Sequence, residues 1–333
     1  MSAGRAVSRL ETAADPPTKI EGAARLAPRV RNGLWALMPI EPITHPSSTS
    51  SPAVADHAGA ATAHEAAPYQ LYRSDGVDNP RIQPNAASFW LQLRGRSRIE
   101  SREGRLLLLP DQWLTFDHDS APCIDTDADS LLIGLSVSPP LLRQIEQQWR
   151  IEVHPGEGSF APARCRQLDD TWRRCAGVVA DDSRESAQTL RRLLASIRDA
   201  QPELEQRLAR CPGRRRSRQR QVFSRLQRMR LYLRGNVHRA VSLEELAQFT
   251  SYSPWWLSKT FRHVYGQTLK SYALSLRIDH ACRLLAETDL SIIEISHDCG
   301  FDSPCSFARR FRQHMDCTAS EYRVNSSAKK NQA

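Results

Sequence analysis

The chain has 333 residues, with 46 Lys+Arg against 37 Asp+Glu, a formal net charge of +9 and 40% hydrophobic residues. This length predicts two domains, and the composition is that of an ordinary globular protein. The sequence contains no run of about 18 apolar residues, so a membrane-spanning helix is excluded. The N-terminus lacks the apolar stretch of a secretory signal, and the eight cysteines form no Cys-x-x-Cys pair, so reduced thiols are expected.

The positive charge is confined to one part of the chain. Residues 1–204 hold 23 Lys+Arg against 26 Asp+Glu, so the remainder carries the whole basic excess. Such a distribution predicts an anionic partner for one domain, with nucleic acid favoured over an anionic membrane. Residues 211–220 combine Pro and Gly with five arginines, and they are interpreted either as a solvated linker or as an arm that contacts phosphates.

The first two thirds of the chain change in character along their length. Residues 1–67 are rich in Ala, Pro, Ser and Thr, which predicts a disordered or loosely docked segment. From residue 68 onwards, short alternating runs are separated by turn residues, and this pattern favours a small barrel or sandwich. The runs are Ser88–Leu93, Arg105–Leu109, Trp113–Phe116 and Leu131–Val137.

Two helical patterns follow the predicted strands. Apolar residues recur at helical spacing between Leu141 and Trp149, and again in a long amphipathic stretch over Glu185–Ala209. The apolar face of the longer stretch has two interpretations of equal weight. It pairs with a second copy in a dimer, or it packs on its own barrel.

Capping signals divide the last hundred residues into helices. Ser242-Leu243-Glu244-Glu245 is a capping box, in which Ser and the Glu three residues later satisfy unpaired amides at a helix start. A turn at Thr250-Ser251-Tyr252 leads to Ser253-Pro254, a good N-cap followed by a residue suited to the first helical position. The second helix is expected to end before Gly266. The pattern predicts a helix–turn–helix unit.

The same arrangement recurs 49 residues later. Ser291-Ile292-Ile293-Glu294 is a second capping box, the helix after it stops at Gly300, and Ser303-Pro304 opens another helix. Between the units, Leu269–Thr288 has the spacing of one long helix. Two such units on one rigid helix would present two recognition helices to successive major-groove segments of DNA.

Val241–Arg323 resembles the DNA-binding domain of the AraC/XylS family of bacterial transcription regulators. The match rests on SLEELA…SPWWLSKTFRHVYG in the first unit and on LRIDHACRLLAETDLSIIEISHDCGFDSPCSFARRFRQ, closed by SEYR, in the rest. The resemblance implies that exposed residues of both recognition helices read base edges and that flanking arginines contact phosphates. The implied residues are Trp255, Ser258, Lys259 and Arg262 in the first unit and Cys305, Ser306, Arg309, Arg310 and Arg312 in the second.

The second unit departs from the family pattern. Pro304 and Cys305 stand where many members have polar readers, and neither side chain makes bidentate contacts. This unit is therefore expected to rely on phosphate contacts, on Arg309 and on apolar contacts with thymine methyls. The further departures are Asp316 for the usual Gly, Ala319 for Pro and Ser296 for Ala.

Ser88–Leu142 resembles, more loosely, the cupin-like sensory domain found upstream of this DNA-binding domain. The chain lacks the His-x-His and following Glu of metal-binding cupins, so no metal, no cofactor and no catalytic site is predicted. Asp117-His118-Asp119 is interpreted as a strand end, with His118 on the opposite face from both carboxylates.

The expected fold class is α+β in two domains. A cupin-like β-barrel or sandwich with following helices (68–210) is joined by the linker (211–220) to an all-α domain of two helix–turn–helix units (221–325), and 326–333 form a flexible tail. The resemblance implies an effector-responsive transcription activator with four partners, namely double-stranded DNA, RNA polymerase, a small-molecule effector and a second copy of the chain. The expected location is the bacterial cytoplasm, at the nucleoid. The alternatives are a cupin-type enzyme with a DNA-binding tail and an architectural DNA binder without an effector.

Overall fold

The computed structural model describes residues 68–330, except 78–79, 81, 83–84, 176–183 and 200. The predicted lead-in of residues 1–67 therefore lies outside the described residues. The strands are β1 Tyr69–Asp75, β2 Ala87–Arg94, β3 Ser97–Ser101, β4 Gly104–Leu108, β5 Gln112–Phe116, β6 Cys123–Thr126, β7 Leu131–Val137 and β8 Gly156–Ser159. The helices are α1 Pro139–Trp149, α2 Pro162–Cys175, α3 Arg184–Asp199, α4 Pro202–Ala209, α5 Arg216–Gly235, α6 Leu243–Thr250, α7 Pro254–Tyr265, α8 Leu269–Glu287, α9 Ile292–Asp298, α10 Pro304–Met315 and α11 Ala319–Lys330. None of the described helices combines the length and apolar character needed to cross a membrane.

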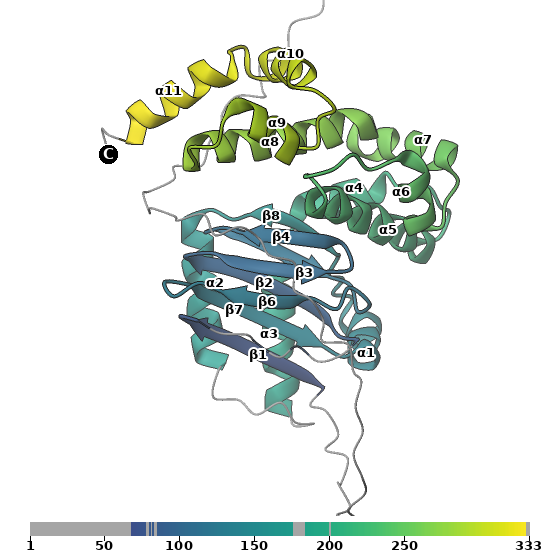
Figure 1. The fold of residues 1–333 in the computed structure, drawn as a ribbon. Coiled ribbons are helices and arrows are strands. Elements are labelled where there is room, and N and C mark those ends of the chain that lie inside the picture. Colours follow the sequence, from purple (N-terminus) through teal and green to yellow (C-terminus); the bar gives the residue numbers. More distant parts are fainter. Residues whose placement is uncertain are drawn as a thin grey trace, which may run out of the picture.

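The N-terminal part is a mixed α/β structure built on two antiparallel sheets. The larger sheet has the strand order β1-β7-β2-β5-β8, and the smaller has the order β4-β3-β6. Side chains alternate along β2, so Phe89 and Leu91 join the core that includes α1–α3, while Trp90 points to the other core, shared with the smaller sheet. Figure 1 shows α2 and α3 behind the strands, and it shows the C-terminal helices above β4 and β8.

Trp90 fills the space between the two sheets. It is fully buried and lies opposite Gly134 of β7, where an added Cβ would come within 2.3 Å of the indole ring. Its indole N–H donates to Ser88 Oγ at 3.0 Å. Leu231 of α5 also belongs to this core, so a helix of the C-terminal part helps to close the sandwich.

The spacing of apolar residues predicted one helical stretch over Glu185–Ala209, but the structure has two helices there, α3 and α4. Helix α3 ends at Asp199, and α4 begins at Pro202 after its N-cap Gln201, because Pro lacks a backbone N–H and takes the first position of a new helix. The apolar face of α3, including Leu190 and Leu193, is no more than 2% exposed within the single chain. The interpretation that this face packs on its own sheet is therefore confirmed, and the face is not available for a dimer.

The prediction of a solvated linker over 211–220 is wrong for its second half, which forms the start of α5. The helix forms there because its arginines find carboxylates on the N-terminal part. Arg216 lies 2.6 Å from Glu205 Oε2 and 3.2 Å from Glu152 Oε2, and Arg220 pairs with Glu146. The described part of the predicted flexible tail is likewise helical, because α11 runs to Lys330.

Helix α5 joins the two parts of the molecule by both apolar and ionic contacts. Val222, Phe223 and Leu226 belong to the same core as the larger sheet, and that core extends to α6, α7 and the start of α8. Glu157 of β8, whose side chain is 10% exposed, contacts Arg230, Arg234 and Tyr272. Burial raises the pKa of Glu157, but the two arginines outweigh that effect and lower it. The first helix–turn–helix unit is therefore held rigidly against the sheets.

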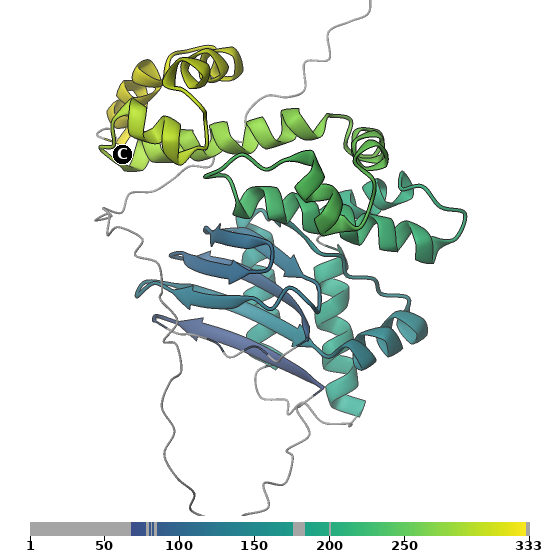
Figure 2. The same ribbon diagram turned by 45° about the vertical axis from the view of Figure 1, so that its right-hand side comes forward.

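The second unit has a core of its own. Phe307 and Phe311 of α10 pack with Ile278 and Leu285 of α8 and with Ile295 of α9, apart from the sheet cores. Figure 2 shows α8 running above the sheets from the first unit towards the second. Arg96, the residue before β3, lies 4.0 Å from Glu287 at the end of α8.

The triplet after β5 is partly as predicted. The strand ends at Phe116, which confirms the strand-end interpretation. His118 does not point away from both carboxylates, however, because its Nδ1 lies 2.7 Å from Asp117 Oδ1. Strand alternation no longer applies once the chain turns, so the predicted opposite face for His118 is wrong.

His280 on α8 makes the stability of the fold depend on pH. Burial, together with the charge of Arg283, lowers the pKa of His280 to about 4, against about 6.5 in an unfolded chain. Between these values the unfolded state binds the proton and the folded state does not, so stability falls as the pH drops from 6.5 to 4. We expect this residue to account for about 3 kcal/mol of the loss.

Urea denaturation between pH 7 and pH 4 measures this contribution. His280→Asn should show a shallower loss of stability on acidification than the unsubstituted chain. His263→Asn, at an exposed position on α7, is the matched control and should follow the unsubstituted chain. Parallel curves for all three proteins would contradict the assignment to His280.

Candidate nucleic-acid interface

Local capping chemistry sets the orientation of the first recognition helix, α7. Ser253 Oγ accepts from the Trp256 N–H, Pro254 occupies the first turn, and Gly266 ends the helix with a φ of 72°. A positive φ costs Gly little, which explains this residue at the helix end. The predicted start and stop of α7 are confirmed. Its inner face consists of Leu257, Phe261 and Val264, all fully buried.

The outer face of α7 presents most of the residues predicted for it. Trp255 is 70% exposed, which is unusual for a large aromatic side chain because it leaves apolar surface in water. Lys259 Nζ lies 4.9 Å from the centroid of its ring. Arg262 is exposed one turn further on, and Ser258 is half-buried. Trp256 packs against Tyr252, with ring centroids 4.0 Å apart. The helix therefore offers an aromatic surface and two cations on one side.

In the capping box predicted for α6, one hydrogen bond is present. Ser242 Oγ accepts from the Glu245 N–H at 3.1 Å. The Glu245 carboxylate instead accepts from Arg239 and from the Tyr232 hydroxyl, both at 2.5 Å. These hydrogen bonds, with that to Arg239 the stronger influence, lower the pKa of Glu245 to about 2. The side chains attach α6 to α5 and to the loop after it, a function that the sequence pattern did not reveal.

The second unit repeats this local chemistry. Ser291 and Glu294 form the complete capping box predicted for α9, and Ser303 Oγ caps α10 by accepting from the Ser306 N–H. Asp316 ends α10 with a φ of 58°, so it adopts the left-handed conformation for which Gly is usual. Thr318 and Glu321 then cap α11 reciprocally. The substitution of Gly by Asp thus leaves the turn intact.

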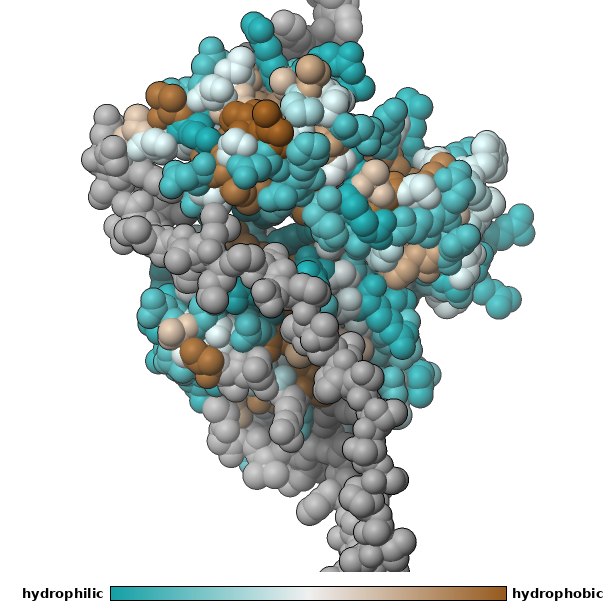
Figure 3. All heavy atoms as spheres, in the orientation of Figure 1, coloured by the Kyte–Doolittle hydropathy of each residue, from teal (hydrophilic) through white to brown (hydrophobic). Residues whose placement is uncertain are grey.

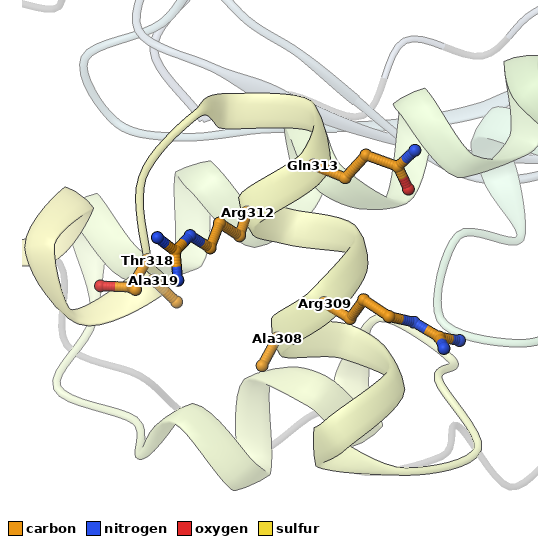
Figure 4. Close-up of a pocket in the computed structure, with 6 residues that line it drawn as sticks. All are labelled: Ala308, Arg309, Arg312, Gln313, Thr318 and Ala319. Atoms are coloured by element: carbon orange, nitrogen blue, oxygen red, sulfur yellow. The ribbon is translucent and has the colours of Figure 1, made fainter.

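The outer face of α10 carries the predicted residues of the second unit. Cys305, Arg309 and Arg312 are exposed, whereas Ser306 and Arg310 are half-buried. Beside them lies an open hollow of about 560 Å³. Figure 4 shows Arg312 extending towards the start of α11, and Arg309 pointing away from it. The residues that line the hollow are Ala308, Arg309, Arg312, Gln313, Thr318 and Ala319. Gln313, which the sequence pattern did not single out, lies four residues after Arg309 on the same face.

The cations of the recognition helices differ from those of α5 in their partners. In the part of the chain that the structure describes, no carboxylate lies within 4.0 Å of the five basic residues predicted to contact DNA. These residues are Lys259, Arg262, Arg309, Arg310 and Arg312. Five of the seven arginines of α5, namely Arg216, Arg220, Arg228, Arg230 and Arg234, are instead used in internal ion pairs. The helical part in Figure 3 is mostly hydrophilic on the face shown. Unpaired cations on exposed helix faces are available to an anionic partner.

Two cysteines of the second unit, Cys299 and Cys305, have different environments. Cys299 is fully buried in the core of the unit, where burial raises the pKa of its thiol to about 12. A thiol that stays protonated is a poor nucleophile, so Cys299 acts as a small apolar residue. Cys305 is exposed on the outer face of α10.

Two clusters in the described N-terminal part bring potential metal ligands within 4.8 Å of one another. They are Asp117-His118-Asp119 and the group of Glu152, His154 and Glu205. Both clusters already have basic partners, because Arg228 lies 2.9 Å from Asp119 and Arg216 lies 2.6 Å from Glu205. The hydrogen bond with His154, followed by the contacts with Arg216, lowers the pKa of Glu205 to about 2. These carboxylates therefore serve ion pairs within the fold.

Comparison with known proteins agrees with this geometry. A family model described as "Helix-turn-helix domain" matches residues 246–325. The transcriptional activator AarP of Providencia stuartii is 35% identical over 95 residues, which cover 28% of this chain and 70% of AarP. The regulatory protein SoxS of Escherichia coli K12 is 34% identical over 88 residues, which cover 26% of this chain and 82% of SoxS. The chain belongs to the AraC/XylS family of transcription regulators.

Solved structures include similar AraC-type domains. The DNA-binding domain of the global transcriptional factor AdpA, solved with a target DNA, is 26% identical, with 32% of this chain and 97% of that chain covered and a TM-score of 0.31. An AraC-type regulator from Chromobacterium violaceum is 24% identical, with 38% and 95% covered and a TM-score of 0.28. As a member of the AraC/XylS family, the chain is a sequence-specific DNA-binding transcription regulator.

Proposed function

We propose that α7 and α10 enter two successive major-groove segments of one DNA duplex. Trp255, Ser258 and Lys259 of α7 and Cys305, Ser306 and Arg309 of α10 then face base edges, while Arg262, Arg310 and Arg312 face phosphates. The observation that carries this proposal is the set of cations on the outer faces of these two helices that have no carboxylate within 4.0 Å, whereas five of the seven arginines of α5 form internal ion pairs. Arginine contacts with guanine would give base specificity, and contacts with phosphate would fix position.

We further propose that residues 68–210 are a cupin-like sensory domain that binds a small effector, and that residues 221–325 are the DNA-binding domain, with α5 packed against both. The two-sheet sandwich with packed helices supports this assignment. In this proposal the protein is an activator that acts with RNA polymerase and as a homodimer in the bacterial cytoplasm. The homodimer has to use a surface other than the apolar face of α3, because that face is buried within the chain.

Single substitutions separate base contacts from phosphate contacts. Lys259→Ala and Arg309→Ala should each weaken binding to the cognate site by about 1–3 kcal/mol and relax the preference at one base position. Arg310→Ala and Arg312→Ala should weaken binding to all sequences alike and reduce the salt dependence of affinity. Fluorescence anisotropy with sites that carry single base changes, at several salt concentrations, measures both effects.

Arg98→Ala is a matched control for these substitutions. Arg98 lies on β3, its side chain is 63% exposed, and it is remote in sequence from both recognition helices. It should leave affinity and salt dependence unchanged. If Lys259→Ala lowered the affinity for every sequence equally, the assignment of Lys259 to a base would be wrong.

A further inference from the structure

A small cavity separates the larger sheet from α1 and α3. Its volume is about 50 Å³, and it lies on the opposite side of the sheet from Trp90. The strands contribute Phe89 and Leu135, the helices contribute Leu142 and Leu194, and the loop between α1 and β8 contributes Val153. In the space between the two sheets, by contrast, the indole of Trp90 is packed against Gly134.

The polar groups of the cavity lie together at one edge. Thr115 Oγ1 accepts from Gln201 Nε2 at 3.3 Å, and the neighbouring Asp117 carboxylate accepts from Ser224 Oγ at 3.0 Å. The rest of the lining is apolar apart from Ser88. A carboxylate at the edge of an apolar space favours a ligand that donates a hydrogen bond and disfavours one that carries a negative charge.

We propose that this cavity is the effector site of the protein, and that it takes a small, mainly apolar molecule with a hydrogen-bond donor and no negative charge. The inference deepens the sensory function proposed above and rests on it. It places the effector between the sheet and the helices, and not inside the sandwich.

Helix α1 is the part of the wall that gives way to a ligand. A volume of about 50 Å³ exceeds the ~10–15 Å³ that one water needs, but it is below the roughly 150 Å³ of a cavity that holds benzene. Leu142 and Val153 at the edge of the cavity are half-buried. Ile145 is the one fully buried residue of α1, and Ser138 at its N-cap makes no side-chain capping hydrogen bond. Outward movement of α1 breaks the ion pair between Glu146 and Arg220 and uncovers partly buried Leu141 and Trp149, but it exposes only one fully buried side chain.

A chain of contacts joins the cavity to the first recognition helix. Asp117 accepts from Ser224 on α5, and the next residue, Arg225, donates to the Thr250 carbonyl at 3.1 Å. The guanidinium of Arg225 also lies 5.1 Å from the ring of Tyr252, which packs on Trp256 of α7. A ligand that takes the Asp117 carboxylate as its acceptor competes with Ser224. Such a ligand thereby alters the contacts through which α5 holds the turn before α7.

Phenol and benzoate are the probes that test the site. They share a ring, but phenol donates a hydrogen bond and benzoate carries a negative charge. In the full chain, phenol should raise the unfolding temperature in a concentration-dependent way, because it binds only the folded state, and benzoate should not. Asp117→Asn removes the repelling charge and should allow benzoate to bind.

Two helix α3 variants locate the binding. Leu194 lines the cavity, while Leu193 is buried outside it. Leu194→Ala should therefore enlarge the cavity and tighten phenol binding severalfold. Leu193→Ala should leave phenol binding unchanged. Absence of phenol binding, or equal effects of the two substitutions, would overturn the site.

Measurements of DNA affinity distinguish ligand binding in the cavity from an effector function of that binding. Phenol should change the affinity for the cognate DNA in the unsubstituted chain. In Ser224→Ala it should bind but leave that affinity unchanged. Phenol binding that depends on Leu194 but never alters DNA affinity would support the cavity as a ligand site and reject the effector function proposed for the domain.

Discussion

Replacing Arg228 with alanine should lower the free energy of unfolding by about 3–5 kcal/mol, because it leaves a buried charge without its partner. Arg228 Nε lies 2.9 Å from Glu103 Oε1, and its Nη1 lies 2.9 Å from Asp119 Oδ2. The Glu103 side chain is fully buried, and after the substitution it keeps only the hydrogen bond from Ser120 Oγ. Urea denaturation followed by circular dichroism measures the loss.

Two further variants show whether the loss comes from the unpaired charge. Arg98→Ala removes an exposed arginine that lies 3.6 Å from Asp125, and it should cost no more than about 1 kcal/mol. Replacing Arg228 with Met and Glu103 with Leu together should recover most of the stability, because neither charge is then buried alone. Equal losses for Arg228→Ala and Arg98→Ala would mean that this pair does not hold α5 to the sheets.

Phe311→Ala should cost the second unit about 3–5 kcal/mol of stability and abolish its contribution to DNA binding. Phe311 is fully buried, and it packs against Phe307 and Tyr322 with ring centroids 5.4 Å and 5.8 Å away. Because the core of this unit is separate from the sheet cores, the sheets and the first unit should stay folded. Hydrogen exchange should therefore accelerate in α9–α11 and in the part of α8 from Ile278 onwards, and remain slow in β2, β5 and β7.

Val324→Ala is the control for this substitution. Val324 lies on α11 of the same unit, but its side chain is 67% exposed, so its removal should change stability by less than about 0.5 kcal/mol. Anisotropy with the cognate site should show near-normal affinity for this variant. Uniform acceleration of exchange in Phe311→Ala, across sheets and helices alike, would contradict the separation of the two cores.

Elements that carry their own signals could be predicted from the sequence. The starts of α7, α9 and α10 follow from Ser side chains that cap backbone amides three residues on, a contact within one turn. Strands β2, β4, β5 and β7 follow from apolar runs bounded by turn residues. Strand β8, with the sequence GEGS, has no such pattern and could not be predicted. It forms through its pairing with β5, where Gly158 lies opposite Trp113.

The contacts between the two parts of the molecule could not be predicted in the same way. Arg228 and Glu103 are 125 residues apart, and neither carries a local signal that names the other. For the same reason, the sequence does not distinguish the arginines of α5, which pair within the fold, from arginines that are available to an anionic partner. For the outer faces of α7 and α10, by contrast, helical spacing and the family motif were enough to predict that Trp255, Lys259 and Arg309 are exposed.

Hydroxyl-radical footprinting on the cognate site tests most directly whether two recognition helices read one duplex. The site is first selected from random DNA with the full chain. We expect two protected windows on one face of the DNA, with centres about one helical turn, or 10–10.5 bp, apart. An insertion of half a turn between them should reduce the affinity to that of one unit alone. A single window, or an affinity that tolerates the insertion, would contradict the account.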